Sequence, residues 1–314
     1  ASINVGTGGV FTIRDDGPNA DVNNAAAAEA LVVDESAGLQ AGENPDRVDT
    51  ANFADNFVSS GVYGTDGAGS TAYALTLSAN GLASGLFALG ANGAQGASIV
   101  LNQTDANTVT GSVGNTTYFT IAIDPTTGVV TFTQALNVYH PNTGNHDDAV
   151  SLSLSSGSLN VVQTVTDADG DTDTASINVG TGGVFTIRDD GPMVSTGDAV
   201  GFNNGLALTG VFDASFGSDG AKVLHGGIEL TSFSGTVGSF AIQNAVSTFA
   251  SVAGSLVTYN IDFDYQPGAS VTTTSHATGT VVFNTATNTY TFDLASPIES
   301  VTTFSTSSPT ASFN

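Results

Sequence analysis

Carboxylates are concentrated in one short stretch of the chain, residues 166–173, which reads TDADGDTD. Four aspartates alternate along it, namely Asp167, Asp169, Asp171 and Asp173. In an extended chain these side chains would share one face, where their like charges repel. A calcium ion, which takes about six to eight oxygen ligands, would relieve that repulsion. The stretch therefore predicts a calcium site, with a solvated acidic turn as the alternative.

The spacing of this stretch differs from that of an EF-hand loop. Gly170 is the fourth residue from Asp167 rather than the sixth, and Asn178 stands where an EF-hand has its closing glutamate. We therefore expect a calcium site of another kind.

Paired acidic residues at three further places suggest metal binding at the ends of domains. The pairs are Asp15 with Asp16, Asp34 with Glu35, and Asp189 with Asp190. Carboxylates contributed from both sides of a linker would let one ion hold two domains together. Arg14 and Arg188 stand beside two of the pairs and offer the alternative, since an arginine can neutralise a carboxylate by itself.

A third acidic group, Asn145-His146-Asp147-Asp148, precedes an expected strand. Asp147 and Asp148 are either calcium ligands or part of an ordinary turn. The histidine raises the question of zinc, but the other ligands of a tetrahedral site are not evident nearby. Calcium is therefore the metal that the sequence predicts.

The composition excludes several classes of partner. The chain has 29 acidic and four basic residues, for a net charge of −25. Nucleic acids and anionic membranes both attract Lys and Arg, so neither is an expected partner. No apolar run approaches the roughly 20 residues that span a bilayer. A hydrophobic content of 40% argues against a disordered acidic chain.

The sequence offers little for enzymatic catalysis. There is no cysteine and no G-x-S-x-G motif, and four histidines are scattered through the chain at His140, His146, His225 and His276. Paired carboxylates can hydrolyse glycosides, but the aromatic residues fall on alternating strand positions that belong in a core. We therefore expect no enzyme.

An exact repeat divides the chain. The eighteen residues ASINVGTGGVFTIRDDGP occur at 1–18 and again at 175–192, which indicates a duplicated structural unit. Residues 1–18 are predicted to be the terminal strand of a preceding module, so we expect the chain to be part of a longer array. Residues 19–192 are predicted to be a complete module, called module one. Residues 193–314, module two, are predicted to be a second β-sandwich module, which is either a different, shorter sandwich or one that is truncated or half of a split domain.

Alternating apolar residues predict strands throughout module one. Tyr73, Leu75 and Leu77 share one face of a run, and the segment 119–123 alternates in the same way before a Pro-Gly turn at 124–128. Seven or more such short strands are expected, with no convincing amphipathic helix. The fold class is therefore predicted to be all-β, a β-sandwich, with a β-barrel as the alternative.

Module two partly parallels module one. Residues 216–221, FGSDGA, match 63–68, YGTDGA, and a hairpin at 281–294 parallels the one at 121–132. Nothing in module two corresponds to residues 150–187. Since 1–18 would be a spare closing strand, strand exchange between molecules is a further hypothesis. A monomeric mass together with an unpaired Val10–Ile13 segment would contradict it.

Several motifs, taken in order, resemble the extender repeats of bacterial RTX (repeats-in-toxin) adhesins, which are large cell-surface proteins. These motifs are LVVDES, YHPNTGNHDDAVSL, TDADGDT and GVFTIRDDGP. The resemblance covers residues 32–192 and 1–18 and is weaker over module two. The glycine-rich nonapeptide repeats that give the family its name are not present. The resemblance implies tandem immunoglobulin-like sandwiches with calcium at their junctions, held by Asp15, Asp16, Asp189 and Asp190 and by the loop residues Asp167, Asp169 and Asp171.

The resemblance also implies a function. It predicts a structural extender segment that calcium rigidifies and that projects a distal ligand-binding region from the cell surface after type I secretion. The partners would be neighbouring modules of the same chain. The alternative is that module two is itself an adhesion module for a sugar or a peptide.

Overall fold

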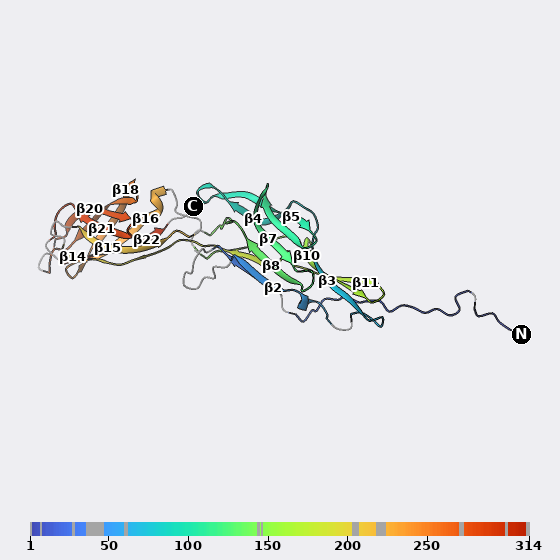
Figure 1. Ribbon diagram of the computed structural model, residues 1–314. Coiled ribbons are helices and arrows are strands. Elements are labelled where there is room, and N and C mark those ends of the chain that lie inside the picture. Colours follow the sequence, from blue (N-terminus) through green and yellow to red (C-terminus); the bar gives the residue numbers. More distant parts are fainter. Residues whose placement is uncertain are drawn as a thin grey trace.

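The structure is a computed structural model of the chain. It describes residues 2–6, 8–26, 29–35, 47–59, 62–142, 145, 147–202, 207–217, 224–269, 273–298 and 301–311. In Figure 1 module one and module two follow each other along the molecule, and the N-terminal segment runs away from module one.

Module one consists of strands and two short 3₁₀ turns. Among the described residues it contains no α-helix. Its elements are β1 (Leu31–Asp34), β2 (Val48–Asn52), η1 (Ala54–Asn56), β3 (Ala68–Leu77), β4 (Leu82–Leu89), η2 (Ala91–Gly93), β5 (Gln95–Asp105), β6 (Thr108–Val113), β7 (Thr116–Ile123), β8 (Val129–Gln134), β9 (Ala149–Ser151), β10 (Leu159–Asp167), β11 (Thr172–Asn178) and β12 (Phe185–Arg188).

The strands of module one form three sheets that enclose one core. Six strands pair in the order β2-β8-β7-β6-β5-β4, and opposite them lie β11-β10-β3 and β1-β12-β9. The predicted alternation is confirmed, since the inward residues Leu75, Phe119 and Ile121 are fully or almost fully buried. Phe132 packs edge-on against Phe119 and Phe185, with ring centroids 5.6 and 5.3 Å away. Facing sheets with a shared apolar interior make a β-sandwich, as the sequence predicts.

The sheet β1-β12-β9 determines which residues lie together at the end of module one that is nearer module two. β12 lies between the other two strands, parallel to β1 and antiparallel to β9. Phe185 and Ile187 of β12 are 0% exposed and belong to the core. Because β1 and β12 run the same way, both finish at the same edge of the sheet, and the residues that follow them lie together.

Module two has its own strands and its own core. The elements are β13 (Met193–Thr196), β14 (Ala199–Phe202), β15 (Leu208–Ser215), η3 (Leu224–Gly227), β16 (Ile228–Val237), β17 (Phe240–Ala241), β18 (Gln243–Ala253), β19 (Leu256–Tyr265), β20 (Ser275–Asn284), β21 (Thr289–Leu294) and β22 (Val301–Ala311). They pair as β13-β15-β21-β20-β19-β18 and as β14-β22-β16-β17. The predicted hairpin is β20-β21, and its residues Val281, Phe283, Tyr290 and Phe292 are buried.

The two modules share a pairing scheme that their sequences only partly reveal. β22 pairs antiparallel with β16 as β10 does with β3, and β14 then takes the place that β11 has in module one. The structure thus supplies a partner strand for β16 where the sequence comparison finds no counterpart of residues 150–187. In the described part of module two, no strands form a sheet like β1-β12-β9.

The first copy of the repeat has a different structure from the second. Val10, Phe11 and Ile13 are exposed and belong to no strand, and Phe11 is 80% exposed. Their counterparts at 184–187 lie in or beside β12. Strand exchange would be contradicted by an unpaired Val10–Ile13 segment together with a monomeric mass in solution. The structure shows the unpaired segment, and the mass is still to be measured.

No helix in the described part of the chain has the length and apolar character needed to cross a bilayer.

The two copies of the repeat provide a matched pair of mutations. Phe185→Ala should lower the free energy of unfolding of module one by about 3–5 kcal/mol, because a fully buried ring is lost from the core. Phe11→Ala, in an identical local sequence, should change it by no more than about 0.5 kcal/mol. Urea denaturation followed by circular dichroism measures both.

Equal damage from the two substitutions would show that Phe11 is packed in solution. Sedimentation would then reveal oligomers, and the strand-exchange hypothesis would be favoured.

Candidate functional site

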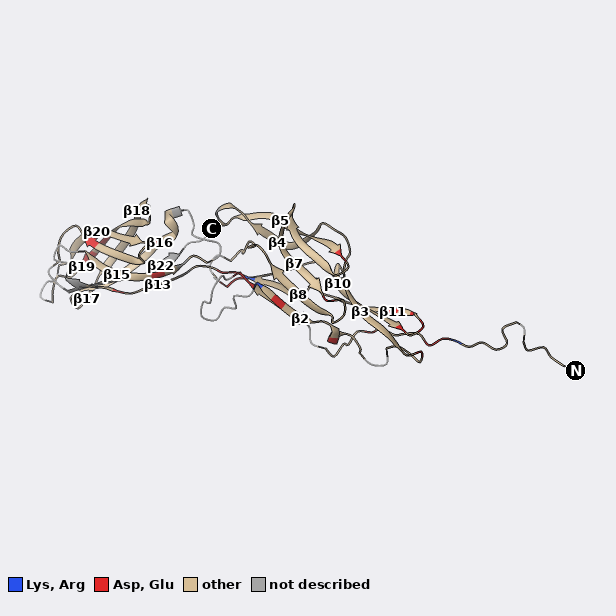
Figure 2. Ribbon diagram, in the orientation of Figure 1, with Lys and Arg blue, Asp and Glu red and all other residues tan. Residues whose placement is uncertain are grey.

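Acidic residues lie at both ends of module one, as well as elsewhere along the chain, as the red segments of Figure 2 show. We call the group near the N-terminal tail the loop cluster; it consists of Asp15, Asp66, Asp167, Asp169 and Asp171. The group near module two is called the buried cluster; it consists of Glu35, His140, Asp148 and Asp189.

The loop cluster is built on the hairpin between β10 and β11. The sequence predicts an interruption over residues 166–174, but β10 extends to Asp167 and β11 begins at Thr172, so the turn is short. Asp167 Oδ1 accepts hydrogen bonds from the backbone N–H groups of Gly170 and Asp171, at 3.0 and 2.9 Å. Asp167 Oδ2 is buried and has no hydrogen-bond partner in the described structure. One oxygen of Asp167 therefore shapes the turn, and the other is buried at its base.

The tail brings a carboxylate to this turn from outside the module. One oxygen each of Asp15, Asp169 and Asp171 lie within 4.8 Å of one another, and all three side chains are exposed. Asp66, in the loop before β3, belongs to the same group. Its hydrogen bond with Asp15 is the main cause of its raised pKa. Carboxylates from the tail and from module one thus converge on one point.

Several carboxyl groups of the loop cluster have shifted pKa values because these groups lie close together. Hydrogen bonds with Asp15 and the surrounding negative charges raise the pKa values of Asp66 and Asp171. The pKa of Asp169 is raised, mainly by its hydrogen bond with Asp167. The pKa of Asp15 is lowered, because Asp171 and Asp66 donate hydrogen bonds to it when they are protonated. Without a cation, protonation of some of these carboxylates relieves part of their mutual repulsion.

Two further predicted ligands anchor the tail and lie outside this group. Asp16 Oδ2 accepts a hydrogen bond from the Thr65 N–H at 3.1 Å, and Asp173 Oδ2 accepts one from the Ala20 N–H at 2.9 Å. The row of four aspartates predicted on one face is therefore wrong in detail, because Asp169 and Asp171 lie in the hairpin turn, whereas Asp173 lies on β11 and contacts the tail.

The buried cluster follows from the strand order. Asp34 pairs with Arg188 in the parallel β1-β12 register, and the Glu35 N–H donates to the Arg188 carbonyl at 3.0 Å. Glu35 and Asp189 come directly after the two strands and therefore lie side by side. The Asp189 N–H donates to the Asp148 carbonyl at 2.8 Å, so the start of β9 adds a third acid.

His140 completes this group. One atom each of Glu35, His140 and Asp189 lie within 4.8 Å of one another, and all three residues are buried. Glu35 Oε1 accepts hydrogen bonds from Gln134 Nε2 at 2.6 Å and from the Val138 N–H at 2.8 Å, and His140 Nε2 is 3.6 Å away. Burial lowers the pKa of His140, but Glu35, Asp189 and Asp148 outweigh it, so that this pKa is raised.

The remaining predicted ligands have other contacts. Asp147 Oδ2 forms an ion pair with Arg188 Nη1 at 2.6 Å, so Arg188 pairs with a carboxylate other than the neighbouring Asp189 and Asp190 for which this alternative was raised. Asp148 Oδ2 accepts a hydrogen bond from the Asn142 N–H at 3.1 Å. Asp34 and Asp190 are buried at the same end of the module. His146, part of the predicted 145–148 group, lies outside the described residues.

The junction with module two repeats the packing of the junction with the tail. Gly64 and Gly217 have φ values of 65° and 66°, and a Cβ on either would clash with a backbone carbonyl, that of Asp16 or that of Asp190. These two aspartates occupy equivalent places in the repeat. Asp219, the counterpart of Asp66 in module two, lies outside the described residues.

Asp66 and His140 are site residues that the sequence prediction did not include. The sequence does contain a pattern that could have identified Asp66, because the segment YGTDGA that includes it recurs in module two as FGSDGA. His140 opens the HPNTGNHDD segment, whose later acids were predicted as ligands, so it could have been included too.

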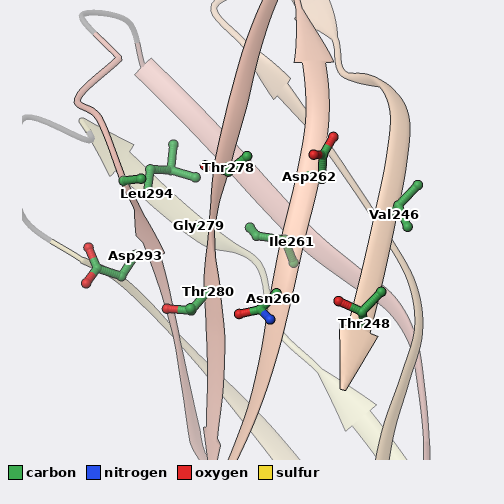
Figure 3. A pocket seen from close by; sticks show the side chains of 11 residues that line it. Val246, Thr248, Asn260, Ile261, Asp262, Thr278, Gly279, Thr280, Asp293 and Leu294 are labelled. Atoms are coloured by element: carbon green, nitrogen blue, oxygen red, sulfur yellow. The ribbon is translucent and has the colours of Figure 1, made fainter. Parts of the chain in front are cut away.

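A different kind of surface lies on module two. The outer face of its larger sheet carries an open groove of about 830 Å³. Figure 3 shows Thr248, Asn260, Thr280 and Asp293 side by side across it. None of the described lining residues is aromatic.

His276 lies close to this groove and contacts two carboxylates. Its Nε2 is 3.2 Å from Asp262, which lines the groove, and its Nδ1 is 3.0 Å from Asp264. The hydrogen bond with Asp264 and the charge of Asp262 raise the pKa of His276, which favours the imidazolium. A protonated ring held between two acids is poorly suited to act as a general base.

A protein-family model described as a domain of unknown function (DUF5801) matches residues 30–180. The matched span begins just before β1 and ends just after β11, so it includes most of module one and the acidic turn. No curated protein and no solved structure matches the chain.

The raised pKa of Asp171 yields a prediction for the metal-free protein. A carboxyl group with a raised folded-state pKa favours folding at low pH, and this contribution is lost as the pH rises through that pKa. Asp171→Asn should therefore raise the melting temperature at pH 7 in chelator, and the gain should shrink as the pH falls toward the ordinary Asp value of 3.8.

Asp293→Asn provides the control, since it removes one exposed charge from module two. Equal stabilisation by both substitutions would mean that overall net charge is responsible, rather than repulsion within the loop cluster.

Proposed function

We propose that this chain is an extender segment of a secreted bacterial surface adhesin of the RTX type, and that calcium at the module junctions keeps it extended. The observation that carries the proposal is the composition of the loop cluster. Asp15 comes from the tail, whereas Asp66, Asp169 and Asp171 come from module one, so one ion would bind both sides of a junction.

The chemistry of the loop cluster suits calcium. All five side chains supply carboxylate oxygens, the ligands that this cation prefers, and three of them lie within 4.8 Å of one another. The buried Asp167 Oδ2 adds an oxygen at the base of the turn. A divalent cation would replace the shared protons and remove the repulsion that raises the pKa values of Asp66, Asp169 and Asp171.

The repeated junction supports the extender role. Asp16 packs against Gly64, and Asp190 packs against Gly217 in the same way. The end of module one therefore contacts module two as the tail contacts module one. A linker that docks identically at successive junctions gives a regular, extended array. The partners in this proposal are neighbouring modules, and the matched domain of unknown function is compatible with it.

The cell's calcium gradient would couple export to rigidity. In the low-calcium cytosol, the carboxylates keep the junction loose, which suits passage through a type I secretion channel. Outside the cell, calcium binds only the ordered junction and therefore stabilises it by mass action. A distal region of the adhesin would then be held away from the cell surface.

Small-angle scattering and thermal melting of the whole chain test this proposal. Calcium should increase the maximum dimension, and at a concentration one hundred times the dissociation constant it should stabilise the protein by about 2.7 kcal/mol. The double variant Asp169→Asn/Asp171→Asn should lose both responses, whereas Asp293→Asn should keep them. The same length and melting temperature in calcium and in chelator would refute the proposal.

The groove of module two supports a second candidate function, that of an adhesion module. Its threonine, asparagine and aspartate side chains could form hydrogen bonds with the hydroxyl groups of a sugar. In that case Thr280→Trp, which fills the groove, should abolish binding on a glycan array without altering the calcium response. Binding that is unaffected by this substitution would exclude the groove.

A further inference from the structure

The buried cluster differs from the loop cluster in containing an imidazole. The His140 side chain is 4% exposed, and neither of its ring nitrogens has a hydrogen-bond partner in the described part of the structure. A buried polar ring normally forms hydrogen bonds, because the loss of water is otherwise uncompensated. His140 Nε2 faces Glu35 Oε1 across 3.6 Å, which is too long for a hydrogen bond.

The ring also lies among buried carboxylates. Glu35 is 0% exposed and Asp189 is 2% exposed, so two carboxylates are buried beside one imidazole. Arg47 donates to the backbone carbonyl of Glu35 and to Asn137, and Arg188 pairs with Asp147. The two negative charges of Glu35 and Asp189 match the charge of a divalent cation bound beside a neutral imidazole.

We propose that Glu35, His140 and Asp189 bind a divalent transition-metal ion, with zinc as the best candidate. Calcium takes oxygen ligands, whereas imidazole nitrogen together with carboxylate oxygen suits zinc and its neighbours in the first transition row. Zinc bonds of about 2.0–2.2 Å place tetrahedral ligand atoms roughly 3.3–3.6 Å apart, which agrees with the separation of Glu35 from His140. Water would take the fourth position.

The surrounding structure holds the ligands in place. The two hydrogen bonds to Glu35 Oε1 fix that carboxylate, and the parallel β1-β12 pairing fixes the distance to Asp189. The ion would connect the ends of β1 and β12 to the segment after Val138. Asp190 follows directly and packs against Gly217, so the ion would also support the junction with module two.

This site shares no ligand with the loop cluster. It does use Asp189, the counterpart of Asp15 in the repeat, so the proposal assigns Asp189 to the buried cluster rather than to a calcium ion at the junction with module two. The site also differs from the zinc site considered for residues 145–148, since neither His146 nor Asp147 belongs to it.

Titration of the full-length chain tests the proposal. Calcium is first added to saturation so that oxygen-only sites are filled, and zinc binding is then measured by calorimetry. Cobalt serves as a spectroscopic probe, because the chain has no cysteine and its visible bands would report nitrogen and oxygen ligands alone. We expect one high-affinity site in the native protein. His140→Asn should weaken it by at least about 100-fold, beyond the effect of losing an outer-shell partner.

His276→Asn is the matched control, because His276 also lies between carboxylates but is exposed. It should leave the high-affinity site unchanged. Zinc binding that survives His140→Asn or is lost in His276→Asn would overturn the proposal, and so would calcium that prevents zinc binding at this site.

Nitrogen-15 NMR of the native chain keeps the test decisive if His140→Asn does not fold. Coordination should shift one ring nitrogen of His140 to a metal-bound value when zinc is added. An imidazolium spectrum that zinc does not change would show that His140 is a buried cation paired with Glu35 and Asp189, and would refute the metal site.

Discussion

The position of β12 between β1 and β9 is the constraint on which the rest of module one depends. The core needs Phe185 and Ile187, and the parallel pairing with β1 brings Glu35 and Asp189 to the same edge of the sheet. The antiparallel pairing with β9 adds Asp148. β12 therefore completes the sandwich and brings the residues of the buried cluster together. It also places Asp190, which follows it, against Gly217 of module two. The acidic residues need not have been close in sequence, because the strand order brings them together.

The repeat shows how far tertiary context determines structure. The same letters form a buried strand at 185–188 and an exposed, unpaired segment at 10–13. Local propensity is identical in the two copies, so the difference comes from whether β1 and β9 are available as partners. A short strand has no internal hydrogen bonds of its own, and its stability comes entirely from its neighbours.

Sequence reasoning was accurate where the physical signal is local. Alternating apolar residues predicted the β7-β8 hairpin and the all-β sandwich, since the alternation records which face of a strand is buried. It was less accurate for the acidic turn, because Asp173 lies on β11 and binds the tail instead of the other aspartates. Asp66 and His140 were missed because each joins residues from distant parts of the chain, such as Asp15 and Glu35, and the strand order that brings such residues together cannot be read from a local pattern.

The two ends of module one present different ligand chemistry, and their burial gives that difference a consequence. The loop cluster contains only oxygen ligands, and Asp15, Asp169 and Asp171 are exposed, so an ion there would exchange with the surrounding solution and follow its calcium concentration. Glu35, His140 and Asp189 are buried beneath the end of the sheet, so an ion there would enter as β12 docks and stay while the module is folded. On this view the exposed site responds to the environment, whereas the buried site belongs to the folded module. An array of such modules could then vary its flexibility at each junction while every sandwich stays closed.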